Sequence, residues 1–162
     1  SAILRNALDQ SEHVERLVLM FQREVALRIT AAPGSREYGL LSVVSQQRAG
    51  VERLFDVSPG SFRPAPRVAA AVLRVTPHRQ PRLAGCCLTV HDQLLRAAFS
   101  KRRKTLRNAL RSGLPWSWDQ LEHHLEDSGI KKENRAETIS VEQWAELAEK
   151  VCVAFGSHGD HT

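Results

Sequence analysis

Apolar residues follow two different spacings along the first half of the chain. Short apolar runs predict strands over 14–21, 51–58 and 69–76. The run Leu17–Phe21 has no polar interruption, which is typical of a strand buried on both faces. Between the strands, apolar positions at helical spacing predict helices over 22–32 and 39–47, although the second segment also resembles a strand. Strands that alternate with helices favour an α/β layered unit.

The chain changes character at a segment rich in proline and glycine. Residues 76–87 carry Pro77, Pro81 and Gly85 without apolar periodicity, which indicates a boundary between two units. Every later apolar pattern has helical spacing, with helices expected over 91–99, 101–110, 117–128 and 140–155. We therefore expect an α/β unit over 1–77, a linker over 78–88, a helical unit over 89–156 and a disordered tail over 157–162.

Two serines mark expected helix starts in the second half. Ser117 with Gln120, and Ser140 with Gln143, have the spacing of a capping box, in which each side chain bonds to the other residue's backbone amide. Gly129 follows the third expected helix, at a position where a glycine with positive φ commonly ends a helix.

Positive charge is concentrated in one stretch of the chain. The protein has 162 residues and a formal net charge of +5 at pH 7, which favours a polyanionic partner. Residues 96–111 contain seven basic side chains and no acidic one. The candidate RNA-binding residues are Arg96, Lys101, Arg102, Arg103, Lys104, Arg107 and Arg111.

On a single helix most of these cations would form one flank. At ~100° per residue, Leu95, Phe99 and Leu106 form an apolar seam, and only Arg102 falls against it. This misfit predicts a helix break near Ser100, with Ser100 as the N-cap of the next helix. Such a run is either a solvated face or a phosphate-binding surface. We favour phosphate contacts because we expect no acidic partner at i,i+4 spacing.

Composition disfavours several other classes of protein. The longest apolar run, Leu17–Phe21, is too short to cross a bilayer, which takes ~20 residues, and no secretory leader is visible. The three cysteines form neither a disulfide framework nor a C-x-x-C metal pair, so we expect a reducing cytoplasm. His123, His124, His158 and His161 are expected on the surface. We predict no metal ligands, no membrane partner and a monomer.

One aromatic residue lies in a stretch that prolines stiffen. Phe62 stands between Pro59 and the pair Pro64 and Pro66, and each proline restricts its own φ and the conformation of the residue before it. The ring could be a hydrophobic plug that closes the bottom of the sheet. It could instead be a platform on which an extruded base stacks, a role that benefits from a loop already rigid before binding.

Several motifs resemble one family of enzymes. The stretch FRPAPRVAAAV (62–72) is similar to the F-x-P-x-P-K/R-V motif of the rRNA adenine N6,N6-dimethyltransferases of the KsgA type, which have the Erm methylases as relatives. PGSREYGLLSV (33–43) resembles the family's PGS-x-x-YG-x-LSV. AAFSKRRKTLRNAL (97–110) looks like its basic helix, and RAETISVEQWAELA (135–148) like its C-terminal helix. The resemblance covers nearly all of residues 14–151.

The resemblance implies an S-adenosylmethionine-dependent enzyme of ribosome biogenesis. Its substrates would be the exocyclic amines of two adjacent adenosines near the 3′ end of small-subunit (16S) rRNA, in the precursor of the 30S subunit. The implied fold is α/β, the C-terminal part of a Rossmann-like class I methyltransferase domain followed by a small all-helical domain. Phe62 would be the catalytic residue that stacks on the target adenine. Pro64, Pro66 and Arg67 would form the substrate loop.

The cofactor site is expected outside this sequence. In the family, the glycine-rich cofactor loop, the acidic ribose ligand and the N-L-P-Y catalytic motif all precede the position that matches Ser1, and no G-x-G occurs here. We therefore expect no cofactor-binding residues in this chain and little or no activity from it alone. Ala69 and Ala70 replace the family's Asp-Ser, and Leu40 replaces an arginine, so contacts near the substrate differ.

Two other functions fit parts of the pattern. A non-catalytic RNA-binding or ribosome-assembly module would keep the docking surface without the chemistry, and motifs upstream of Ser1 would distinguish it from the enzyme. A helix-turn-helix DNA-binding protein would explain the cations but neither Phe62 nor the strands. The dimethyltransferase is the function that we predict.

Overall fold

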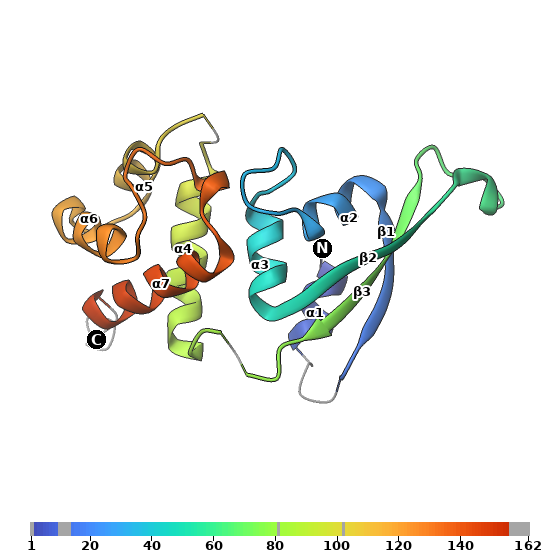
Figure 1. Ribbon diagram of the computed structural model, residues 1–162, viewed down its shortest axis with the longest axis horizontal. Helices are drawn as coiled ribbons and strands as arrows, with labels where there is room; N and C mark the ends of the chain where they lie inside the picture. The colour runs from blue at the N-terminus through green and yellow to red at the C-terminus, as the bar shows by residue number, and fades with distance from the viewer. Residues whose placement is uncertain (1, 10–13, 81, 102, 156–162) are drawn as a thin grey trace. The chain divides into compact units, whose positions relative to one another are not determined.

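The structure, a computed structural model, describes residues 2–9, 14–80, 82–101 and 103–155 (Figure 1). These residues form two compact units, Ser1–Pro81 and Arg82–Thr162, called the sheet unit and the helical unit below. The division falls inside 78–88, the segment expected to be a linker. The tail expected over 157–162 lies outside the described residues.

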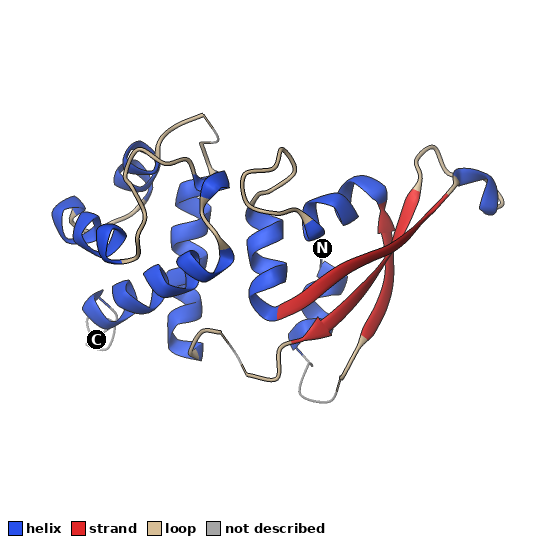
Figure 2. Cartoon of the chain, viewed as in Figure 1, coloured by secondary structure: helices blue, strands red, loops and turns tan. Residues whose placement is uncertain are grey.

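The sheet unit contains antiparallel strands. β1 (Leu17–Gln22), β2 (Ala49–Val57) and β3 (Ala70–Pro77) lie in the order β1-β3-β2, so β3 is central (Figure 2). Each strand coincides, to within a few residues, with a segment that the apolar runs predict. A β-bulge between Arg53 and Phe55 shifts the register of β2 against β3. A bulge increases local twist, and this one precedes the loop that contains Phe62.

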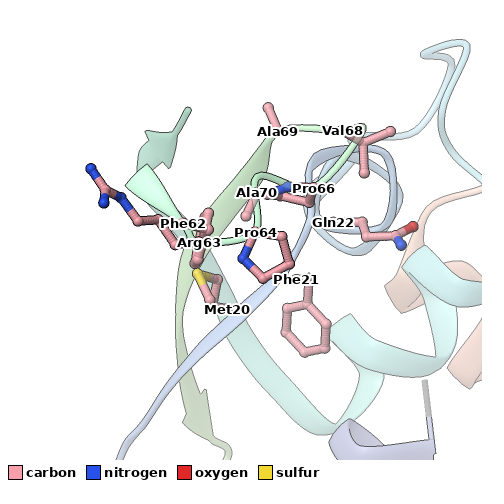
Figure 3. A pocket seen from close by; sticks show the side chains of 10 residues that line it. All are labelled: Met20, Phe21, Gln22, Phe62, Arg63, Pro64, Pro66, Val68, Ala69 and Ala70. Carbon is pink, nitrogen blue, oxygen red and sulfur yellow. The ribbon is translucent and has the colours of Figure 1, made fainter. Parts of the chain in front are cut away.

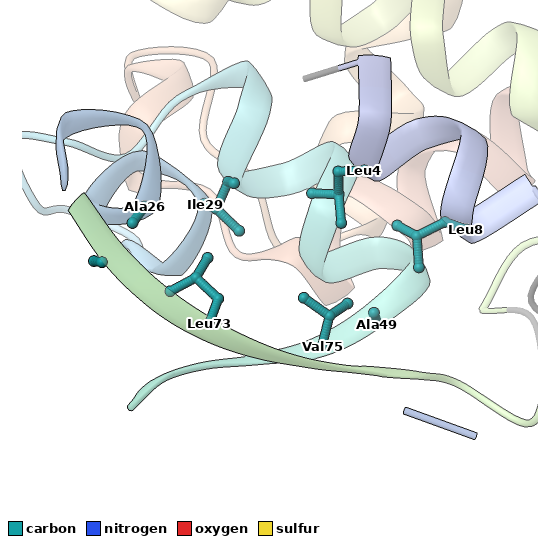
Figure 4. Close-up of a cluster of buried hydrophobic side chains, with 8 residues drawn as sticks. Leu4, Leu8, Ala26, Ile29, Ala49, Leu73 and Val75 are labelled. Carbon is teal, nitrogen blue, oxygen red and sulfur yellow. The ribbon is translucent and has the colours of Figure 1, made fainter. Parts of the chain in front are cut away.

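One face of the sheet is covered by helices, α1 (Ala2–Asp9), α2 (Arg23–Thr30) and α3 (Leu40–Arg48). Side chains alternate between the two faces of a strand, and the inward set forms a buried cluster with residues of the helices (Figure 4). Its members are Leu4, Leu8, Ala26, Ile29, Ala49, Ala71, Leu73 and Val75. Full burial of a large aliphatic side chain stabilises a fold by ~1.5–3 kcal/mol, so this cluster is the main source of cohesion in the sheet unit.

The other face of β1 is open in the described chain. Val18 and Met20 are 60% and 52% exposed, whereas Leu17, Leu19 and Phe21 pack toward the helices. The expectation that this strand is buried on both faces is therefore wrong for the described residues. A continuous apolar run does not say which of its two faces a neighbouring layer covers.

Segment 39–47, which also resembled a strand, forms helix α3 and supports the end of α2. Gln46 Nε2 donates to the carbonyl oxygen of Ile29 at 3.0 Å, and Ser42 Oγ donates to that of Arg28 at 2.5 Å. The last carbonyls of a helix have no partner within it. Side chains of α3 supply those partners, which joins the two helices.

The helical unit packs around Trp144. Its described elements are the 3₁₀ turns η3 (Gly85–Cys87) and η4 (Ala136–Thr138) and the helices α4 (Leu88–Phe99), α5 (Leu106–Gly113), α6 (Trp118–Asp127) and α7 (Val141–Phe155). Trp144 is fully buried, with its ring centroid 5.9 Å from that of Phe99. A Cβ at Gly113 would lie 2.8 Å from that of Ala97, so glycine permits the close approach of α5 to α4. No helix of the described ranges is long and apolar enough to span a bilayer.

Two of the expected helix signals are present. Ser140 and Gln143 form a capping box, with Gln143 N donating to Ser140 Oγ and Ser140 N donating to Gln143 Oε1, both at 3.1 Å. Gly129 follows α6 with φ +67°, a left-handed conformation that favours glycine. These two signals are confirmed.

Two other signals are wrong. Ser117 is the N-cap of α6 but makes no capping hydrogen bond with its side chain, so the second box does not form. The helix does break after Phe99, yet Ser100 does not begin the next one. Its Oγ donates to Ala97 O at 2.8 Å, and Thr105 is the N-cap of α5. Since α4 ends at Phe99 and α5 begins at Leu106, the cations do not share one helix.

Candidate functional site

The loop between β2 and β3 is built as a stiff turn. The 3₁₀ turn η2 (Pro59–Ser61) opens it, and the amide of Phe62 donates to Pro59 O at 3.2 Å. A cis peptide bond precedes Pro64. At the far end, Arg23 N donates to Ala69 O at 2.9 Å, which attaches the loop to the start of α2. Hydrogen bonds therefore hold the loop at both ends, with prolines between them.

A pocket of about 420 Å³ lies between this loop and the end of β1 (Figure 3). Its lining residues are Met20, Phe21, Gln22, Phe62, Arg63, Pro64, Pro66, Val68, Ala69 and Ala70. Phe62 is half-buried and does not belong to the buried cluster of the sheet unit. Its ring thus lies in the wall of an open hollow and not within the hydrophobic interior.

The pocket is suited to a flat apolar group with a polar edge. Phe62, the two prolines and Met20 provide apolar surface, and Gln22 is a side-chain amide at the rim. The guanidinium of Arg63 extends away from the other lining side chains (Figure 3). The lining contains no carboxylate and no glycine. It therefore does not fit S-adenosylmethionine, whose binding in this class of fold uses a glycine turn and an acidic ribose ligand.

The structure places the predicted substrate-loop residues in two groups. Pro64 and Pro66 line the pocket beside Phe62, whereas Arg67 is exposed and is not among the lining residues. Sequence reasoning missed the contribution of β1 and of Arg63 to the lining. Residues of β1 are about 40 positions from the loop, and no local pattern links the two segments.

A group of ion pairs lies at the end of β2, where the loop that contains Phe62 begins. Arg23 Nε lies 3.1 Å from Asp56 Oδ2, and Arg53 lies 3.7 Å from the other oxygen of the same carboxylate. All three side chains are more than a third exposed, so each pair contributes at most about 1 kcal/mol. The geometric effect matters more, because the pairs connect β2 to the start of α2 beside the pocket.

The predicted RNA-binding residues lie on α4, on α5 and on the connection between them. All of those that the structure describes are exposed: Arg96, Lys101, Arg103, Lys104, Arg107 and Arg111. Arg102 lies outside the described residues. Because α4 packs on α5, the cations of these two helices lie in the same region of the helical unit.

Three of these cations have partners within the protein. Arg96 Nε lies 2.6 Å from Asp92 Oδ2, so the expectation of no acidic i,i+4 partner is wrong. Asp92 lies just before the basic stretch 96–111. This hydrogen bond and charge raise the pKa of Arg96. Lys101 Nζ donates to Ser112 Oγ at 3.0 Å, and the guanidinium of Arg107 lies 5.9 Å from the ring centroid of Trp118.

Trp118, which is half-buried, also connects Arg107 to residues that follow it in the chain. Its Nε1 donates to Glu122 Oε2 at 2.8 Å, and Lys132 Nζ lies 2.6 Å from Glu122 Oε1. The hydrogen bond from Lys132 is the main reason that the pKa of Glu122 is lowered. Arg107 is therefore oriented by packing, whereas Arg103, Lys104 and Arg111 make no ion pair within the described ranges.

The first backbone amides of α5 already donate hydrogen bonds to other parts of the protein. The amides of Leu106 and Arg107 donate to the carbonyl oxygens of Asn134 and Lys132 at 2.8 and 3.1 Å. Helix N-terminal amides can bind anions when they are free, but these two are already satisfied. A phosphate at this surface would be contacted by side chains.

The fold matches those of two solved methyltransferase structures. The chain superposes on a dimethyladenosine transferase from Plasmodium falciparum with a TM-score of 0.76, at 24% identity over 98% of this chain and 64% of that one. It superposes on the 23S rRNA methyltransferase ErmE with a TM-score of 0.64, at 23% identity over 92% of this chain and 59% of that one. The predicted fold class, an α/β class I methyltransferase portion followed by helices, is confirmed.

The sequence identifies the family more narrowly. Residues 1–152 match the family model for ribosomal RNA adenine dimethylases, and the chain belongs to that family. Two relatives named ribosomal RNA small subunit methyltransferase A are each 43% identical to it. The one from Syntrophotalea carbinolica aligns over 93% of this chain and 57% of its own length, and the one from Geobacter metallireducens over 92% and 54%. The chain thus spans about half the length of the curated relatives it matches.

Proposed function

We propose that this chain provides the target-base loop and the RNA-docking surface of a small-subunit rRNA adenine N6,N6-dimethyltransferase. The methyl donor would be S-adenosylmethionine, and the substrates two adjacent adenosines near the 3′ end of the rRNA in the 30S precursor. Membership of the adenine dimethylase family supports the class of reaction. The single observation that carries the assignment of roles is the position of Phe62 in the wall of an open pocket.

Phe62 is proposed to stack on the extruded adenine. Stacking of a base on an aromatic ring contributes ~1–3 kcal/mol, and a loop that is already ordered loses less entropy when the base binds. Pro64 and Pro66 keep the ring in place, and the bond from Arg23 N to Ala69 O fixes the end of the loop. Holding the ring plane fixes the direction of the exocyclic amine, and such orientation lowers the barrier to methyl transfer.

The exposed cations of the helical unit are proposed to bind rRNA phosphates. Arg103, Lys104 and Arg111 are exposed without an acidic partner in the described ranges, so phosphate binding need not break an ion pair. Contacts of this kind supply affinity and position without reading the base sequence. Arg63, which lines the pocket, and Arg67, which is exposed, are proposed to contact the backbone of the target strand.

We assign no cofactor contact to the described residues. The pocket lining does not fit S-adenosylmethionine, and the sequence has no G-x-G. The expected outcome of calorimetry on the chain as printed is no binding of S-adenosylmethionine at micromolar concentrations. Micromolar affinity would contradict the assignment of the pocket to the base alone.

The proposed function is tested by mass spectrometry of small-subunit rRNA from a strain that lacks the gene. Dimethyladenosine should disappear and should return when the gene is restored, and it should form much more slowly when the restored gene carries Phe62→Ala. Persistence of dimethyladenosine in the deletion strain would instead support the non-catalytic module, a protein that assists ribosome assembly by RNA binding alone. For both the enzyme and this alternative, we propose a monomer that acts in the cytoplasm.

A further inference from the structure

The three cysteines of the chain meet at one place in the helical unit. Cys86 and Cys87 belong to η3 at the beginning of the unit, and Cys152 belongs to α7 near its end. Their sulfur atoms all lie within 4.8 Å of one another, with 3.8 Å between those of Cys86 and Cys87. The packing of η3 on α7 therefore assembles a three-thiol cluster from two distant segments.

We propose that the three-thiol cluster of Cys86, Cys87 and Cys152 binds a thiophilic d¹⁰ cation, Zn²⁺ or Cu⁺. Thiolates are the ligands that select these ions in proteins. An ion with metal–sulfur distances of ~2.3 Å holds its sulfurs ~3.8 Å apart in tetrahedral geometry and ~4.0 Å apart in trigonal geometry. The sulfur positions in the fold match this spacing with only small side-chain adjustments.

Access and protonation at the cluster are consistent with metal exchange. Cys86 is exposed and Cys152 is half-buried, so an ion reaches the sulfurs from solvent. Burial, followed by the two neighbouring thiols, raises the pKa of Cys87 to about 12. The Cys87 thiol is therefore neutral when no cation is bound. Cation binding must release protons, so apparent affinity rises with pH.

A bound ion would connect the two ends of the helical unit. Such a connection stabilises the folded state in proportion to the logarithm of the ion concentration over its Kd. For a unit of this size, a hundredfold excess over Kd should raise the thermal midpoint by about 10–20 °C. All three tryptophans lie in the helical unit, so tryptophan fluorescence follows its unfolding directly.

The test uses the whole chain, reduced and kept without oxygen. Co²⁺ is titrated first, because sulfur-to-cobalt charge-transfer absorption reports thiolate ligands, and Zn²⁺ is then added to displace it. A Cu⁺ titration with a chromophoric competitor distinguishes a trigonal site for Cu⁺ from a tetrahedral site for Zn²⁺ with water as fourth ligand. The expected result is one ion per chain, with charge-transfer absorption and a raised thermal midpoint.

Two cysteine variants test whether the metal ion binds at the three-thiol cluster. Cys152→Ser should weaken Zn²⁺ binding by about tenfold or more and so reduce the shift in thermal midpoint by about half or more. Cys86→Ser, at an exposed position, provides the same test if Cys152→Ser does not fold. The control His123→Gln removes an exposed imidazole outside the cluster and should change nothing.

Three outcomes would overturn the proposal. One is the absence of charge-transfer absorption in the reduced, folded chain. Another is unchanged metal binding in both cysteine variants, which would place the ion on surface histidines. The third is a mass lower by two hydrogens in protein purified under reducing conditions. That mass would mean a disulfide between two of the thiols, leaving too few ligands for the ion.

Discussion

The sheet unit and the helical unit present different chemistry to a nucleic acid. In the sheet unit, a loop fixed by prolines and by hydrogen bonds at both ends surrounds an apolar pocket. In the helical unit, several exposed cations lie on α4, on α5 and on the connection between them, and only some have partners. A base requires a wall in a fixed position, whereas phosphate attraction acts over several ångströms and tolerates mobile side chains. Mutations in the pocket should therefore lower the rate of methylation without lowering RNA affinity, and mutations of the cations should lower RNA affinity.

The largest expected effect is on RNA affinity, from reversing the charge of Arg103, Lys104 and Arg111 to glutamate. At ~0.1 M salt, loss of three phosphate contacts should weaken binding on the order of 100- to 1,000-fold and reduce the slope of log affinity against log salt by about 2–3. Arg107 is left unchanged because it packs over Trp118. Binding is measured by anisotropy with a small-subunit rRNA fragment across a salt series.

The control for charge reversal is Arg16→Glu. Arg16 is exposed and precedes β1, at the end of that strand away from the pocket. It should cost far less affinity per charge than the triple variant. A salt slope that stays constant in the triple variant would contradict phosphate docking by the helical unit.

The next effect concerns the stability of the helical unit at low pH. His91 is 4% exposed, its Nε2 has no hydrogen-bond partner among the residues that the structure describes, and burial lowers its pKa to about 4. Above pH 6.5 the ring is neutral whether folded or unfolded. Between pH 6.5 and about 4 only the unfolded chain takes up the proton, so the free energy of unfolding should fall by about 3 kcal/mol across that window and level off below it.

Tryptophan fluorescence in denaturant at a series of pH values measures this loss. His91→Leu should abolish the His91 part of the pH response, while His123→Gln, at an exposed ring, should keep it. Tyr38, the single tyrosine, is buried in the sheet unit and gives a separate signal there. An identical pH dependence in wild type and His91→Leu would show that His91 does not control this transition.

Phe62→Ala should affect catalysis and spare affinity. Loss of ~1–3 kcal/mol of stacking predicts an about 5- to 150-fold lower rate of adenine dimethylation. The affinity for rRNA should change less than about twofold, because the cost of unstacking the target base offsets its stacking on Phe62 in the bound complex. Phe62→Tyr should retain most activity. The rate is followed in rRNA from the deletion strain restored with each variant.

A second aromatic residue of the sheet unit provides the matched control. Phe55 is 58% exposed on β2 and does not line the pocket, so Phe55→Ala removes the same side chain elsewhere in the unit. Its dimethylation rate should stay near that of the wild type. Equal losses from Phe55→Ala and Phe62→Ala would mean that both act through the stability of the sheet and not through the base.

The smallest expected effect compares two serines of the helical unit. Ser140→Ala breaks a formed capping box and should lower the free energy of unfolding by about 1 kcal/mol. Ser117→Ala removes a side chain that makes no capping bond and should cost only a few tenths. Chemical denaturation followed by tryptophan fluorescence measures both. Equal costs would mean that the Ser117 box forms in solution.

The cap signals illustrate why sequence reasoning succeeds in parts. The Ser140 box was predictable because its partners are three residues apart and act within one turn of helix. Ser117 has the same spacing but no such bond, because a cap also requires a side-chain orientation that surrounding packing decides. Asp92 was missed as the partner of Arg96 because it stands just before the basic stretch.

Local patterns in the amino-acid sequence determined the helices and strands, the basic stretch, the proline-stiffened loop and the resemblance to adenine dimethylases, since each depends on residues near one another in the chain. Tertiary structure alone decided which face of β1 is covered, which residues of β1 face Phe62 across the pocket, and that Cys152 meets Cys86 and Cys87. These depend on contacts between distant segments. Such contacts arise from burial of apolar area, which is not directional and leaves no local signature.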